Sequence, residues 1–115
     1  MFRCPGCDEQ QLEICQSFEL APGDRWDEEM LQMIACNSCE SAGLAVYQEC
    51  RRGALDEEDV HHEGAFLPMK ELMTVRATLL LCPDPKNGRC GCAAHKELRS
   101  LTDAVLLKKL FPMKR

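Results

Sequence analysis

Large aromatic side chains are scarce in this sequence, which has one Trp, one Tyr and four Phe among its 115 residues. A chain of this length forms one domain or two small lobes. A core so short of large side chains is expected to need cross-links or bound metal ions.

Long apolar runs are missing too. No segment approaches the ~18 residues that cross a membrane, and no apolar signal segment precedes Cys4. These absences favour a cytoplasmic protein without membrane contact. In a reducing cytoplasm, cysteines usually bind metal or act in catalysis instead of forming disulfides. The chain has nine cysteines, an odd number that excludes complete disulfide pairing within one chain.

Positive charge is scarce in one half only. Residues 1–66 carry 4 Lys and Arg against 15 Asp and Glu, a net charge of −11, whereas residues 67–115 carry 10 against 4, a net charge of +6. A phosphate backbone would be repelled by the first half and mildly attracted by the second. The charge therefore disfavours nucleic acid as a partner of the first half and leaves it possible for the second.

The sequence does contain two pairs of closely spaced cysteines, Cys4-Pro5-Gly6-Cys7 and Cys36-Asn37-Ser38-Cys39. Each Cys-x-x-Cys turn can present two thiolates to one ion, and four sulfur ligands are what tetrahedral Zn²⁺ favours in structural sites. Four protein ligands leave no coordination position for water or substrate. The pattern therefore predicts a structural metal site and no catalytic one.

Alternation of apolar and polar residues predicts strands over residues 12–20 and 44–50, and residues 60–66 are expected to form a final short strand. Periodicity does not decide whether residues 30–35 form a strand or a short helix. We assign a strand, because it would run antiparallel to residues 12–20 if the two cysteine turns share a metal ion. In the first strand, the expected apolar face consists of Leu12, Ile14, Phe18 and Leu20. In the third, Leu44, Val46 and Cys50 are expected opposite Ala45, Tyr47 and Glu49.

Two helices are expected in the second half. Pro68 suits the first turn of a helix that runs to about Cys82, before Pro83. A second helix is predicted over about 94–110, with Leu98, Leu101, Val105 and Leu110 facing inward. The fold class is thus α+β: an antiparallel β lobe over residues 1–66 and a helical hairpin over residues 67–115.

With its two cysteine turns and antiparallel strands, the first part of the chain resembles a zinc ribbon, matched at Cys4, Cys7, Cys36 and Cys39. The 28 residues between the pairs exceed the ~15–20 of a compact finger. A rubredoxin-like iron centre is the alternative, but such centres usually place Gly where this chain has Asp8 and Glu40. The whole layout resembles small uncharacterised bacterial zinc-ribbon proteins, a likeness that implies no activity.

A second group of metal-ligand residues, Cys82, Cys90, Cys92 and His95, surrounds the turn between the predicted helices. Gly91 would let Cys90 and Cys92 approach one point, and His95 would lie on the first turn of the next helix. We therefore expect a second zinc ion that joins the two helices. The alternative is a helical hairpin with free thiols.

The other candidate ligands are weaker. His61 and His62 are adjacent and would point to opposite faces of a strand, so surface or packing roles are expected, with either one a substitute for His95. Cys15 is expected on a polar face, where acidic neighbours raise its pKa, and Cys50 on an apolar one. Because the two side chains are expected to face away from each other, Cys15 and Cys50 are poor partners for a disulfide.

The sequence therefore predicts a non-catalytic zinc-binding protein that recognises another protein, with Trp26 and Tyr47 as possible contacts. The first alternative is a nucleic-acid-binding zinc ribbon, whose contacts would come from the basic residues Arg99, Lys108, Lys109, Lys114 and Arg115. The second is a metalloenzyme with the second cluster as an open zinc site.

Overall fold

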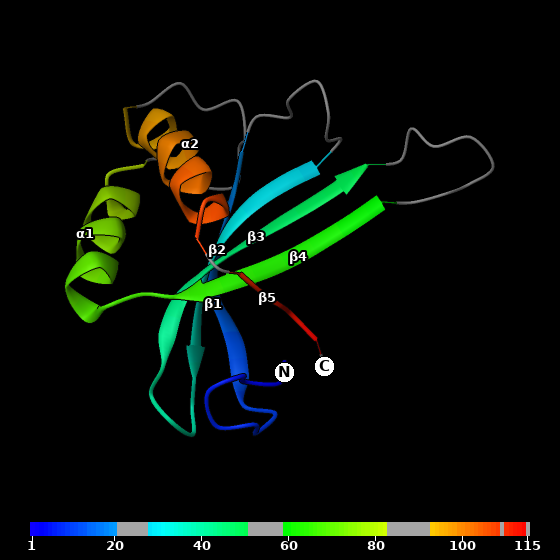
Figure 1. Cartoon of the computed structure of the whole chain (residues 1–115). Helices are drawn as coiled ribbons and strands as arrows, with labels where there is room; N and C mark the ends of the chain where they lie inside the picture. The colour runs from blue at the N-terminus through cyan, green and yellow to red at the C-terminus, as the bar shows by residue number, and fades with distance from the viewer. Residues whose placement is uncertain (21–27, 51–58, 83–92, 109, 115) are drawn as a thin grey trace.

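Five antiparallel strands and two helices make up the part of the chain that the computed structural model describes, residues 1–20, 28–50, 59–82, 93–108 and 110–114 (Figure 1). The elements are β1 (Leu12–Glu19), β2 (Glu28–Cys36), β3 (Ala42–Cys50), β4 (Asp59–Phe66), α1 (Met69–Leu80), α2 (Ala93–Leu106) and β5 (Phe111–Pro112). The predicted α+β class and the four long strands are confirmed.

The strands lie in the sheet in chain order, β1-β2-β3-β4-β5, each antiparallel to its neighbour. The backbones of β3 and β4 lie close together at Gly43. A Cβ atom there would lie 1.9 Å from the carbonyl oxygen of Ala65, so only glycine permits this approach.

The two faces of the sheet carry separate cores. We call one the helix face, because α1 and α2 lie on it (Figure 1); its cluster consists of Phe18, Leu20, Leu31, Leu44, Val46, Leu72, Val75, Leu79 and Val105. We call the other the terminal face, because both chain ends pack on it; its cluster consists of Cys4, Leu12, Ile34, Cys36, Ala45 and Met113. Leu44 and Val46 are thus opposite Ala45, as predicted.

One expected face was wrong. Leu12 and Phe18 lie in different cores, because the register of β1 shifts between Ile14 and Gln16. Cys15 is the additional residue, and such a β-bulge moves every later side chain to the opposite face. β1 therefore contributes Leu12 to the terminal face and Phe18 to the helix face.

The second helix is also shorter than predicted. It ends at Leu106, where the last turn tightens as the N–H groups of Leu107 and Lys108 donate to the carbonyls of Ala104 and Val105. The chain then returns to the sheet as β5, at the edge of β4, a place where Pro112 is tolerated. The sequence analysis missed this strand.

The chain ends close the terminal face. The N–H of Phe2 donates to the carbonyl of Leu12 at 2.7 Å, and the next residue, Arg3, donates to the carbonyl of Lys114 at 2.6 Å. The first residues thus join the β1 edge to the tail that follows β5. We call this connection the terminal clasp. The division into lobes at residues 66 and 67 stays a prediction, although helices and sheet share the helix-face core.

Candidate metal centre

The two cysteine turns have the same backbone design. The N–H of Cys4 donates to the carbonyl of Glu9 at 2.9 Å, and the N–H of Cys36 donates to the carbonyl of Ser41 at 2.8 Å, five residues on in each case. The residue after the second cysteine has a left-handed backbone in both turns, with φ of 62° at Asp8 and 61° at Glu40. Glycine adopts this conformation most readily.

The left-handed backbone that the two turns share matters for the choice between a zinc and an iron centre. The sequence argument against a rubredoxin-like centre relied on the absence of Gly at these two positions. Asp8 and Glu40 nevertheless adopt the glycine-type conformation, so the turn itself does not depend on glycine. The absence of glycine at these positions is therefore no argument against an iron centre.

The two turns lie at the same end of the sheet (Figure 1). Their four cysteine sulfur atoms come together there. The Sγ atoms of Cys4 and Cys39 are 3.6 Å apart, as are those of Cys7 and Cys36, and all four lie within 4.8 Å of one another. A sulfur–sulfur bond would be ~2.05 Å long, so these are free thiols and no disulfide. The predicted first cluster is confirmed as a possible metal site.

The spacing of the sulfur atoms fits a tetrahedral ion. A Zn–S bond of ~2.3 Å gives a tetrahedron with edges of about 3.8 Å, close to the two distances of 3.6 Å. The ligand environment is uneven: Cys4 and Cys36 are buried, Cys7 is half-buried and Cys39 is exposed. Cys4 and Cys36 therefore belong to the terminal-face core as well as to the site.

Protonation differs across the site. Burial raises the pKa of the Cys4 thiol to about 12. Hydrogen bonds from the side chain and then the backbone of Ser41 lower the pKa of Cys39 to about 6, and the two side-chain atoms are 3.2 Å apart. Because metal ligands must be thiolates, a cation beside Cys4 would favour the charged form that burial disfavours. Ser41 was missed by the sequence analysis.

The second predicted cluster is not brought together among the described residues. Cys82 is half-buried after α1, whereas Cys90 and Cys92 lie outside the described residues. His95 belongs to α2, but its side chain lies outside them as well. The second zinc site therefore stays a prediction.

His62 packs on the terminal face, between two aromatic rings. Its ring centroid is 5.2 Å from that of Phe2 and 5.5 Å from that of Tyr47, edge-on in both cases. Its Nε2 is 2.6 Å from Oε1 of Gln32, and burial lowers its pKa. His61 is exposed, 3.9 Å from Glu63. His62 thus has the packing role and His61 the surface position that the sequence predicted.

The two remaining thiols are only partly described. Cys15 is exposed, and its pKa is raised by burial and then by Glu13. The predicted acidic influence on Cys15 is confirmed, but the polar face is not: the bulge places Glu13 opposite Ala35 and Ser17 opposite Gln32, on different faces. The side chain of Cys50, like all of Trp26, lies outside the described residues.

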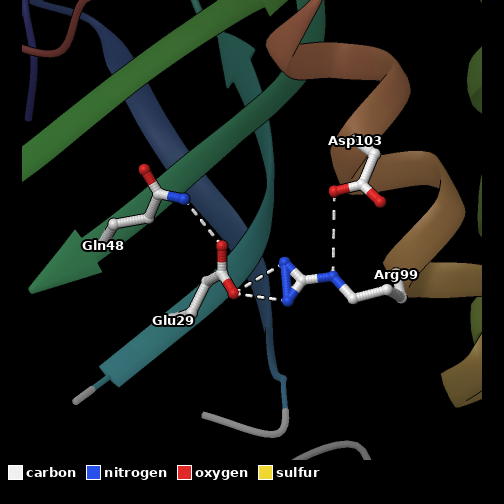
Figure 2. Close-up of polar contacts among 4 residues, drawn as sticks. All are labelled: Glu29, Gln48, Arg99 and Asp103. Atoms are coloured by element: carbon white, nitrogen blue, oxygen red, sulfur yellow. Dashed lines mark hydrogen bonds and ion pairs between the residues drawn. The ribbon is translucent and has the colours of Figure 1, made fainter. Parts of the chain in front are cut away.

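A buried ionic contact on the helix face was not predicted. Figure 2 shows Glu29 of β2 between Gln48 of β3 and Arg99 of α2. The Glu29 carboxylate accepts bonds of 2.5 and 2.6 Å from Arg99 and one of 2.7 Å from Gln48, and its side chain is 2% exposed. The signal in the sequence is an acidic residue in register with Leu31 and Met33 on an apolar face, since a buried charge requires a partner.

The chain matches no protein-family model, no curated protein and no solved structure. Neither helix of the described part is long and apolar enough to cross a membrane.

Proposed function

We propose that Cys4, Cys7, Cys36 and Cys39 hold one Zn²⁺ ion and that the first part of the chain is a zinc ribbon. The observation that carries this proposal is the convergence of four free sulfur atoms from two matching turns, within 4.8 Å of one another. The ion supplies positive charge that stabilises four thiolates and links the N-terminal segment to β2 and β3. Because all four ligands come from the protein, the role is structural and not catalytic.

Metal analysis combined with native mass spectrometry tests this proposal. One zinc per chain is expected, lost in Cys36→Ser and retained in Cys15→Ser, whose thiol is outside the site. Iron in the purified protein, with its visible colour, would instead identify a rubredoxin-like centre. No bound metal in the native protein would contradict both.

A second zinc ion, on Cys82, Cys90, Cys92 and His95, is part of the same proposal. Its support is the spacing of four ligand residues, three Cys and one His, within 14 residues around a turn. Two zinc ions per chain that fall to one in Cys82→Ser would establish it. One zinc ion in both proteins would eliminate it and leave the first site unaffected.

The protein's role, we further propose, is to bind another protein through α1. One side of α1 packs on the helix face through Leu72, Val75 and Leu79. An adjacent side is also apolar, with Met69, Met73 and Leu80 between 64% and 70% exposed. A helix that is apolar on more than one side is normally covered on more than one side.

Charge indicates what kind of partner would cover this surface. Lys70 and Arg76 flank the exposed side chains of α1, and within the described residues neither forms an ion pair. We therefore propose a partner segment with apolar anchors and acidic neighbours. Complementary charge of this kind selects the partner and speeds its association more than it tightens the complex.

The test is a quantitative pull-down with the double variant Leu80→Gln/Leu81→Gln, since Leu81 is 78% exposed beside Leu80. The matched control is Lys96→Gln/Glu97→Gln on the exposed part of α2. A partner with an acidic, apolar segment that is retained by the wild type and the control, and lost with the α1 variant, supports the proposal. A partner lost with neither variant refutes this surface.

The nucleic-acid alternative has less support. Arg99 already binds buried Glu29, which leaves exposed Lys108 and Lys114 among the described basic residues named for that role. Retention of RNA or DNA with a steep dependence on salt would favour it. If the second zinc site were open and catalytic, the absorption bands of the cobalt-substituted protein would differ from those of closed tetrahedral coordination.

A further inference from the structure

Four sulfur-containing side chains lie around one small cavity that is separate from the four-cysteine site. The cavity, of about 140 Å³, lies between the sheet and α1. Its lining includes Cys15, Met33, Met69 and Met73. Three of the six methionines of the chain are therefore at this one place. We call it the sulfur pocket.

The local backbone explains how these side chains meet. Cys15 is the additional residue of the β1 bulge, and the register on either side pairs Ile14 with Ile34 and Gln16 with Met33, so Cys15 lies beside Met33. Bulges commonly redirect a side chain in this way. Met69 and Met73 are four residues apart on α1, a spacing that places side chains next to each other on a helix.

The donor set has a definite chemical preference. Thiolate and thioether sulfur are soft ligands that select Cu(I), whereas Zn²⁺ binds Cys, His and carboxylates but not methionine. The described lining holds no His, Asp or Glu. Its one charged residue is Arg76, and Glu13, the acidic neighbour that raises the pKa of Cys15, is not part of the lining.

Access to the pocket is open. Met69 and Met73 are each 64% exposed, and Cys15 is exposed as well. A cavity filled only for packing would bury these side chains, as the helix-face core buries Leu72 beside them. Three of the four sulfur-containing side chains are therefore accessible to an incoming ion without unfolding of the sheet, whereas Met33 is half-buried.

We propose that the sulfur pocket binds one monovalent soft metal ion of the Cu(I) class, with the Cys15 thiolate and the thioethers of Met33, Met69 and Met73 as its ligands. On binding, the Cys15 S–H bond is replaced by a sulfur–metal bond and the proton passes to solvent. The metal does not change its oxidation state. The proposal involves none of the residues of the four-cysteine site and does not depend on its occupancy.

The test is a titration of zinc-loaded protein with Cu(I) without oxygen, followed by NMR of methionine methyl groups labelled with ¹³C. Cu(I) is diamagnetic, so each methyl signal stays visible. With the first equivalent, the signals of Met33, Met69 and Met73 are expected to shift. Met113 packs in the core cluster with Cys4 and Cys36, so its unchanged signal, together with no release of zinc, would show that the four-cysteine site is intact.

Variants establish which sulfur atoms are ligands. Cys15→Ser and Met69→Leu/Met73→Leu are expected to weaken Cu(I) binding by at least about 10-fold, the lower limit of the loss seen when a residue that merely supports a metal ligand is removed. Leu keeps the apolar surface and removes only the sulfur. Met30→Leu, outside the pocket lining, is the matched control and is expected to bind like the wild type.

Two outcomes would overturn the proposal. In the first, the signals of Met33, Met69 and Met73 do not move while zinc is released and Met113 shifts, so that copper attacks only the four-cysteine site. In the second, Cu(I) binds the leucine variants as tightly as the wild type, so that the pocket is an apolar surface whose sulfur atoms have no role.

Discussion

The two faces of one sheet are held together by different means. The helix face buries aliphatic side chains under α1 and α2 and contains the ionic contact of Glu29 with Arg99. The terminal face buries Leu12, Ile34 and Met113 against half-buried aromatic rings, no helix covers it among the described residues, and it is completed by the chain ends and the four-cysteine site. Backbone hydrogen bonds of the chain ends and the proposed metal ion are expected to stabilise this face.

The largest effect should follow from breaking the metal centre. Chelation, or Cys36→Ser, is expected to lower the free energy of unfolding by about 5 kcal/mol or more, because a structural zinc can supply ~10–16 kcal/mol to a small peptide fold. In a hydrogen-exchange measurement, the backbone amides of Cys4 and Leu12 on the terminal face should lose the most protection, and those of α1 the least. An equal loss of amide protection on both faces would contradict the proposed difference between them.

The helix face should be sensitive to the loss of the ionic contact between Arg99 and Glu29. Arg99→Met is expected to cost about 3 kcal/mol, because it leaves the buried Glu29 carboxylate without its cation (Figure 2). Adding Glu29→Gln should recover part of that loss, since no buried charge remains. Urea unfolding measures both variants. Asp103→Asn is the control: that carboxylate is 65% exposed and 3.9 Å from Arg99, so little change is expected.

The turns of the metal centre should accept glycine with a gain in stability. Glu40→Gly is expected to raise the free energy of unfolding by about 1 kcal/mol, because it relieves a left-handed backbone at φ 61°. Asp8→Gly should gain less, since Asp tolerates this conformation better. Glu9→Gly removes a similar charge without such a backbone, and thermal unfolding should show no gain for it.

The smallest effect concerns pH on the terminal face. Burial lowers the pKa of His62 below its ordinary 6.5, so the unfolded chain binds the proton first and the fold loses stability as pH falls through 6.5 towards the lower folded value. Unfolding of zinc-loaded protein between pH 7 and 6 should show this slope, reduced in His62→Gln and unchanged in His61→Gln. An unchanged slope in His62→Gln would assign the effect to another group.

Local patterns predicted much of the fold and the four cysteines that the structure brings together. The spacing of Cys4, Cys7, Cys36 and Cys39 was sufficient for the first site, since two short turns on antiparallel strands meet at one end. Alternation indicated β1 and β3, the expectation of a shared metal ion indicated β2, and Pro68 indicated the start of α1.

The features that the sequence did not reveal depend on contacts between distant residues. The bulge at Cys15 cannot be read from alternation, because only pairing with β2 shows where the register shifts. β5 has two residues, and its partner β4 is about fifty residues earlier. The contact of Glu29 with Arg99 joins residues 70 apart, and the register with Leu31 could indicate burial but not the partner.

The terminal clasp has a consequence for how the protein is made. A bond between Arg3 and Lys114 spans nearly the whole chain, so it cannot form until the segment around Lys114 has left the ribosome. The four cysteines emerge long before that point and can take up metal while the terminal face is still open. The proposed ion could therefore bind before the contact between Arg3 and Lys114 forms.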